Sequence, residues 1–154
     1  YFTDYLNQQN GKEVCELCQE AEYYIAISAY KLRDKNATDI LEAYLEKYPN
    51  TPMFSYVNFL IGHSYYDRAK FDNAMKHYNQ VNDLHLSDED AEEYLFTKGY
   101  TFLTQKKYKE ASRCFYSLTG FNKKYKDEAE DCYAYCEFSQ QNYADALDTF
   151  IIIE

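Results

Sequence analysis

The stretch IGHSYYDRAKFDNAMKHYNQV, residues 61–81, decides the fold, because its pattern of small and aromatic residues returns twice later in the chain. The later copies are KGYTFLTQKKYKEASRCFYSL, residues 98–118, and YAYCEFSQQNYADALDTFIII, residues 133–153. Self-similarity at a period of roughly 20–50 residues is typical of stacked supersecondary units. The matched positions are Gly62, Gly99 and Ala134; Phe71, Tyr108 and Tyr143; Ala74, Ala111 and Ala146; and Tyr78, Phe115 and Phe150.

Each copy divides into two apolar patterns of helical period, separated by a turn such as DRAKF at residues 67–71. Two antiparallel helices approach closely where small side chains cross, and the aromatic rings then fill the space between one pair and the next. A lone helix pair cannot bury its apolar face, so successive pairs must stack. A weaker first copy, residues 25–49, places Ile25 in the small position, Ser28 in the aromatic position and Ala37 in the alanine position.

The spacing resembles that of the tetratricopeptide repeat (TPR) family. The family pattern has a small residue, an aromatic residue three positions later, an alanine twelve later and an aromatic residue four beyond that. Two copies match it, with Gly62, Tyr65, Ala74 and Tyr78, and with Gly99, Phe102, Ala111 and Phe115; the fourth copy departs at Glu137. The resemblance implies an all-α fold, a right-handed α-α superhelix of about four helix-turn-helix repeats, and a non-catalytic role in binding other proteins.

The repeat boundaries follow from this register. Residues 1–11 are predicted to end a preceding repeat, with a turn at Gly11, and the final stretch TFIIIE lacks the polar cap that normally closes a solenoid. We therefore expect a single solenoid domain that is a piece of a longer array, or one whose last helix is covered by a partner or by self-association. The predicted repeats are residues 12–49, 50–86, 87–122 and 123–154.

Charge and cysteine usage limit the partners. The formal net charge of −10 disfavours nucleic acid, because an acidic surface repels phosphates. No segment approaches the roughly 20 apolar residues that a membrane-spanning helix needs. Five cysteines at uneven spacing do not form a disulfide framework and favour the cytoplasm. The long connections and KYPNTP at residues 47–52 are similar to repeats of bacterial envelope proteins, so periplasm or cell envelope stays open beside the cytoplasm.

Three local motifs have structural explanations. Cys15 and Cys18 have the CxxC spacing, but Cys132 and Cys136 lie three repeats away, so these thiols are predicted to be core or semi-buried residues and no metal or cofactor is expected. His63 precedes Ser64 directly, and neighbours on a helix point about 100° apart, so no catalytic pair is expected. Asn36 of the triplet NAT is predicted to cap a helix, as is Ser87.

The resemblance also implies a binding surface, because partner contacts in the family project from the first helix of each repeat. The residues carried over are Tyr30, Tyr56, Phe59, His63, Tyr66, Phe96, Tyr100, Tyr135 and Phe138. They predict an aromatic concave groove for a peptide or subunit, since aromatic residues are enriched at binding hot spots. Two alternatives stay open: the rings pack on one another, or the same ladder binds a glycan or small ligand. The basic carboxylate clamp of one TPR branch is absent.

Overall fold

The computed structural model describes the backbone of residues 2–120 and 124–140, and side chains from residue 15 onward within those ranges. The described part is helical, with turns and no strand, as the sequence predicts. Its elements are α1 (Phe2–Lys31), α2 (Ala37–Lys47), α3 (Phe54–Asp67), α4 (Phe71–Tyr78), the short 3-10 helix η1 (Asp83–His85), α5 (Asp88–Thr104), α6 (Tyr108–Thr119) and α7 (Lys126–Gln140).

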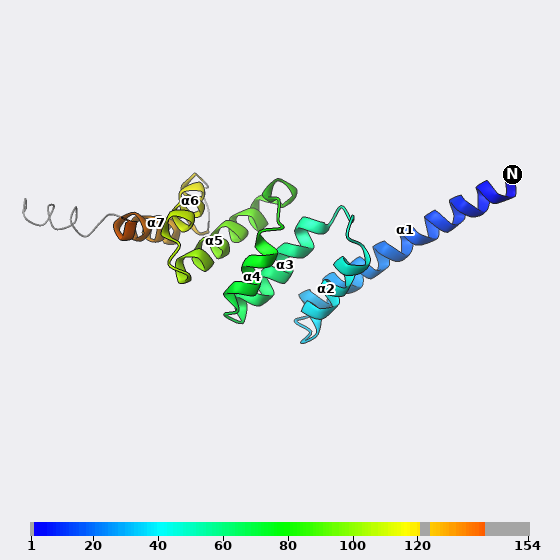
Figure 1. Cartoon of the computed structure of the whole chain (residues 1–154), viewed down its shortest axis with the longest axis horizontal. Helices are drawn as coiled ribbons and strands as arrows, with labels where there is room; N and C mark the ends of the chain where they lie inside the picture. Colours follow the sequence, from blue (N-terminus) through cyan, green and yellow to red (C-terminus); the bar gives the residue numbers. More distant parts are fainter. Residues whose placement is uncertain (1, 121–123, 141–154) are drawn as a thin grey trace, which may run out of the picture.

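The helices form an α-α solenoid of helical repeats. α1 pairs with α2, α3 with α4 and α5 with α6, and the pairs follow one another along the long axis of the molecule (Figure 1). α7 packs on α6, and neighbouring pairs meet through the contacts of α2 with α3 and of α4 with α5. Within the described ranges no helix is long and apolar enough to cross a membrane.

The helix pairs close where the sequence places its smallest residues. A Cβ atom on Gly62 would lie 2.6 Å from ring atoms of Tyr78, and one on Gly99 would lie 3.0 Å from the ring of Phe115. The alanines at positions 74 and 111 are fully buried on the second helix of each pair. The predicted small residues at the helix crossings are therefore confirmed in α3–α4 and α5–α6. The rings of Tyr78 and Phe115 pack against the glycines inside the pair, a contact that the sequence did not predict.

The turn inside each repeat has one recurring conformation. Its central residue is left-handed: Arg33 with φ 55°, Ala69 with φ 56° and Lys106 with φ 57°. The backbone N–H of the next residue donates to a carbonyl five residues back, which satisfies the free end of the preceding helix. These bonds join Asp34 to Ala29 at 3.0 Å, Lys70 to Tyr65 at 2.9 Å and Lys107 to Phe102 at 2.9 Å.

This turn corrects the predicted register of the first repeat. Gly62 and Gly99 each lie seven residues before the left-handed residue, and the residue seven before Arg33 is Ala26, not Ile25. Ala26 is fully buried, whereas 61% of Ile25 is exposed. The prediction was wrong because it kept a spacing of twelve residues between the small residue and the alanine, whereas Ala26 and Ala37 lie eleven residues apart.

Two other expectations about the ends of elements differ from the structure. The turn predicted at Gly11 is wrong, because α1 continues through it; a glycine inside a helix costs only about 1 kcal/mol. Asn36 stands at the start of α2, but its side chain makes no capping bond, and its own N–H donates to Asp34 Oδ1 at 2.8 Å. The fourth-copy positions Tyr143, Ala146 and Phe150 lie outside the described residues.

Ser87 caps α5 as predicted. Its Oγ accepts from the N–H of Asp90 at 3.2 Å and donates to the Asp90 carboxylate at 2.8 Å. Behind this cap, Tyr94 is buried and its hydroxyl donates to the carbonyl oxygen of Tyr78 at 3.0 Å. This bond ties the second pair of helices to the third, so the core runs without a break from α1 to α5.

Candidate interaction site

The predicted site residues lie on the first helices of the repeats, α1, α3, α5 and α7, but they differ in exposure. Tyr100, Tyr135 and Phe138 are exposed, whereas Tyr30, Tyr56, His63, Tyr66 and Phe96 are partly buried. Phe59 is only 2% exposed and belongs to the core. Phe59 is therefore unavailable as a contact residue, because the ring of Tyr94 from the following repeat packs against it at 6.4 Å between centroids.

Five of these rings form a continuous series of contacts, which we call the aromatic ladder: Tyr56, Phe59, His63, Tyr66 and Tyr100. Successive ring centroids lie 6.3, 6.0, 6.1 and 6.1 Å apart. The first four rings come from α3, and Tyr66 meets Tyr100 of α5 edge to face. The ladder therefore crosses from one repeat to the next, and its rings do pack on one another, as one of the alternatives states.

The remaining predicted rings have partners of their own. Phe96 packs against Phe115 and stacks on Tyr125 with a centroid distance of 4.6 Å, which covers one of its faces. On α7, Tyr135 meets Tyr108 edge to face at 6.2 Å. Phe138 lies on the same helix and is 52% exposed. These contacts place the α7 residues beside the third repeat, and the helix expected to follow α7 is outside the described residues.

Carboxylates surround the ladder. His63 Nε2 lies 3.4 Å from Glu93 Oε1 and 3.7 Å from Asp67 Oδ1, so the imidazole bridges α3 and α5. Burial raises the pKa of the Tyr30 hydroxyl, and the charges of Asp67 and Glu93 raise it further. Burial likewise raises the pKa of Tyr66 to about 12. Both hydroxyls stay protonated at neutral pH, as an ordinary tyrosine hydroxyl does.

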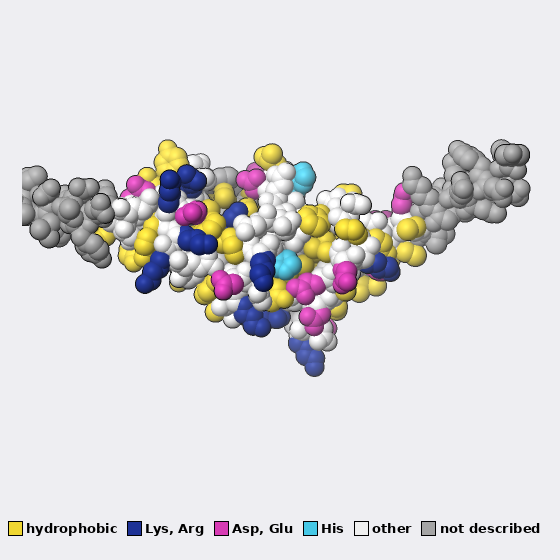
Figure 2. All heavy atoms as spheres, in the orientation of Figure 1, with side chains coloured by type: hydrophobic (Ala, Val, Ile, Leu, Met, Phe, Trp, Pro, Cys, Tyr) yellow, Lys and Arg dark blue, Asp and Glu magenta, His cyan; other side chains and the backbone are white. Residues whose placement is uncertain are grey.

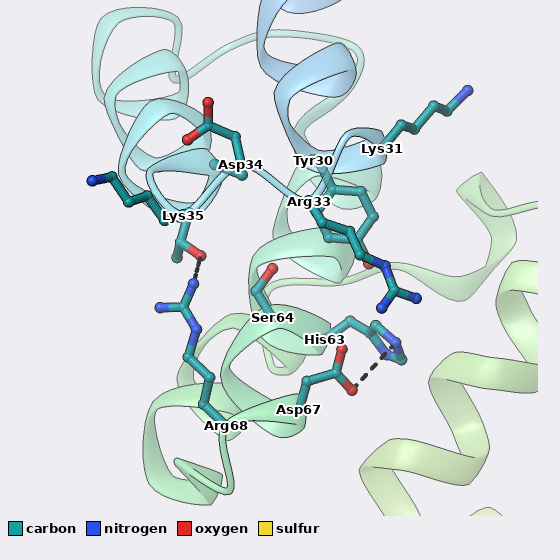
Figure 3. A pocket seen from close by; sticks show the side chains of 11 residues that line it. Tyr30, Lys31, Arg33, Asp34, Lys35, His63, Ser64, Asp67 and Arg68 are labelled. Atoms are coloured by element: carbon teal, nitrogen blue, oxygen red, sulfur yellow. Dashed lines mark hydrogen bonds and ion pairs between the residues drawn. The ribbon is translucent and has the colours of Figure 1, made fainter.

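A hollow of about 360 Å³ lies where α1, the α1–α2 turn and α3 meet, and Tyr30 and His63 line it. Figure 3 shows Arg33, His63 and Asp67 on one side of this hollow and Lys35 and Arg68 on the other. The Ser64 hydroxyl donates to the Leu60 carbonyl at 3.0 Å. The bond from serine to histidine that a nucleophile pair requires is not formed.

A second polar cluster joins α2, α3 and α4, and the sequence-based reasoning missed it. His77 Nδ1 lies 2.9 Å from Asn58 Oδ1, and His77 Nε2 lies 3.5 Å from Glu42 Oε1. Tyr65 donates to the same Glu42 oxygen at 2.7 Å and stacks on the imidazole. The pattern of one helix could not reveal the cluster, because its members come from three helices and meet only once the repeats are stacked.

The cysteines correct another expectation. Cys15 and Cys18 are exposed on α1, not buried in the core, whereas Cys136 is fully buried. Burial raises the pKa of Cys136 to about 11. In the described part of the chain, no group of three or more His, Cys, Asp or Glu side chains could hold a metal ion.

Residues 20–51 match the family model described as tetratricopeptide repeat. The match covers the end of α1 and all of α2, which is the first repeat, the copy whose small and aromatic positions the sequence register fits least well. Comparisons with curated proteins and with solved structures gave no match. Together with the stacked helix pairs, the match supports a TPR family. Such repeats generally mediate protein–protein interaction.

Proposed function

We propose that the chain is a non-catalytic interaction module, which holds a peptide or subunit of a partner protein against the exposed side of the aromatic ladder. The observation that carries this proposal is the Tyr66–Tyr100 contact, because it joins two repeats into one aromatic surface. Tyr100 stays 39% exposed at the end of that surface. Tyrosine offers a large contact area at low entropic cost, which is why it is frequent at binding hot spots.

The charges beside the ladder indicate the chemistry of the partner. Asp67, Glu93 and Asp90 all act on the Tyr30 hydroxyl, so this side of the array is rich in carboxylates. Lysine and arginine side chains bind both carboxylates and the faces of tyrosine rings. We therefore infer that the bound segment carries basic residues between its apolar ones.

An affinity capture with the full chain tests the proposal. Tyr100→Ala should weaken capture of the partner about tenfold or more, as truncation of a hot-spot tyrosine does. Tyr66→Phe, which keeps the ring and removes the hydroxyl, should reduce capture less. Tyr116→Ala is the matched control, since Tyr116 is 64% exposed on α6, away from the ladder. Equal recovery with Tyr100→Ala and with the wild type would refute the proposal.

A glycan or small-ligand module is the alternative use of these rings. It has less support, because sugar rings stack on flat exposed faces, whereas Tyr66 and Tyr100 meet edge to face with an interplanar angle of 81°. An oligosaccharide screen against the same variants separates the two functions, since only a glycan module would lose sugar binding in Tyr100→Ala.

A further inference from the structure

The turns inside the repeats concentrate the positive charge of an acidic chain. Half of the 16 lysine and arginine residues lie in or beside the three turns, although the net charge of the chain is −10. All of them are exposed. We call these residues the basic edge; they are Lys31, Arg33 and Lys35 at the first turn, Arg68 and Lys70 at the second, and Lys106, Lys107 and Lys109 at the third.

The three turns lie along one side of the solenoid. Figure 1 shows the α1–α2, α3–α4 and α5–α6 turns at the lower end of their helix pairs. Figure 2, in the same orientation, shows Lys and Arg side chains at several places along this lower side, with Asp and Glu side chains among them, and other Lys and Arg side chains elsewhere on this face. The left-handed turn recurs with the same geometry, so Arg33 and Lys106 occupy equivalent positions in their turns, and so do Lys70 and Lys107.

Two hollows separate the three turns. The first, of about 360 Å³, lies between the α1–α2 turn and the end of α3. The second, of about 550 Å³, lies between the α3–α4 turn and the end of α5, where Gln105 donates to Asp72 at 2.9 Å. The edge is therefore not flat, since basic projections alternate with spaces large enough for side chains.

The charges of the basic edge are available to a ligand. Among the described residues, none of these eight side chains forms an ion pair with a carboxylate. Arg68 donates a hydrogen bond to an uncharged acceptor, from Nη2 to Thr38 Oγ1 at 3.2 Å. In Figure 3, Lys31 and Lys35 point outward from the first hollow, while the Arg33 guanidinium lies on the side of His63.

We propose that the basic edge is a second docking surface, which binds an extended acidic segment of a partner protein. The carboxylates of the segment meet the turns, and its intervening side chains enter the two hollows. The alternation of projections and hollows fits a polypeptide better than a flat membrane. Asp34, Asp67 and Asp72 lie among the basic residues, and together with the overall acidity they disfavour the uniformly charged phosphates of a nucleic acid.

The test uses a fluorescein-labelled peptide of about 15 residues, alternating Glu and Ser, which spans about 50 Å when extended. A peptide with Gln in place of Glu is the charge control. The edge variant combines Arg33→Gly, Lys70→Gln and Lys106→Gly. Its two glycines replace left-handed residues, where glycine is the favoured residue, so the variant should fold at least as well as the wild type. Fluorescence anisotropy of the full chain gives the affinity, and thermal melting confirms folding.

We expect the wild type to bind the acidic peptide more weakly at high salt, and the edge variant to bind it about tenfold more weakly, as the loss of three surface charge contacts implies. The control variant removes the same charge elsewhere, by Lys76→Gln, Arg113→Gln and Lys124→Gln, and should change the affinity less than twofold. Tyr100→Ala should leave this binding unchanged, which separates the basic edge from the aromatic ladder.

Three results would overturn the proposal. The first is no binding of the acidic peptide by the wild type. The second is an equal loss in the edge and control variants, which would reflect overall charge. The third is edge-dependent binding of phosphatidylserine vesicles without binding of the peptide, which would make the edge a membrane-binding surface.

Discussion

Gly62 and Tyr78 are fitted to each other: a Cβ on the glycine would lie 2.6 Å from Cδ1 and Cε1 of the ring. Tyr78 is fully buried, so its ring has no free space into which to move. The contact brings α3 and α4 together, and the hydrogen bond from Tyr94 to the Tyr78 carbonyl joins α5 to the same point. One glycine therefore controls the packing of two repeats.

Gly62→Ala should lower the free energy of unfolding by about 1–3 kcal/mol, the usual cost of overpacking a closed core. The matched control is Gly120→Ala, where the nearest atom to a new Cβ is the Ser117 carbonyl oxygen at 3.8 Å and φ is −77°. That control should stay within about 0.5 kcal/mol of the wild type. Urea unfolding followed by circular dichroism measures both, and equal stability of the two variants would contradict the fit of Gly62 to Tyr78.

Ala69→Gly should raise the free energy of unfolding by about 0.5–1 kcal/mol, because Ala69 pays for a left-handed φ of 56° that glycine adopts freely. The same substitution at Ala43, exposed inside α2, should lower it by about 1 kcal/mol. The two substitutions should therefore change the free energy of unfolding in opposite directions, which urea unfolding measures. A loss of stability at both positions would mean that the recurring turn carries no strain.

His77 predicts a dependence of stability on pH. Burial lowers the pKa of this imidazole, the Glu42 carboxylate partly opposes the shift, and Lys76 adds to it. The unfolded chain, with an ordinary histidine pKa near 6.5, then binds more protons than the folded chain. The contribution of His77 to the free energy of unfolding is therefore complete above pH 6.5. It is lost as the pH drops below 6.5 through the lowered pKa of the folded state.

Urea unfolding between pH 7.5 and 5 measures this dependence. His77→Gln should flatten it, because the titrating group is removed. His85→Gln is the matched control, since it makes the same substitution at a histidine that is exposed in η1. A profile that is the same in His77→Gln and in the wild type would assign the pH dependence to other groups.

The thiols should differ in reactivity. Cys15 and Cys18 are exposed and should be alkylated by iodoacetamide at pH 8 within minutes, whereas Cys136 is buried with a pKa raised to about 11 and should react only after unfolding. Peptide mapping by mass spectrometry in the absence and presence of urea locates the labels. Rapid labelling of Cys136 in the folded protein would show that α6 and α7 do not pack as described.

The repeat could be predicted from the sequence because its packing code is local. The distance from Gly62 to Ala74 and Tyr78 lies within one helix pair, so the spacing in the chain maps directly onto contacts in space. The first repeat was placed one residue out of register, because Ala26 and Ala37 lie eleven residues apart there and not twelve. The left-handed residue Arg33 carries no sequence signal, since glycine, the usual residue there, is absent.

The candidate site could be predicted only in part. Register alone places Tyr66 and Tyr100 on the first helices, and the structure brings them together. The same register includes Phe59, whose burial depends on Tyr94 from the next repeat. The cluster of Glu42, Asn58 and His77 depends on contacts between repeats as well. The exposure of a side chain and its contacts with the next repeat depend on how successive helix pairs pack. The spacing of residues within one copy does not predict them.

The stacking of successive helix pairs has a mechanical consequence. In the described helices, each helix pair packs on the pair that follows it, through α2 with α3, and through α4 with α5 and α3 with α5, so tension applied to the two ends passes through every junction in series. The extensions of the individual junctions then add up to the extension of the whole array. The junction with the weakest packing separates first. A partner that contacts both Tyr66 and Tyr100 would bridge the junction between the second and third helix pairs. It would make that junction harder to extend.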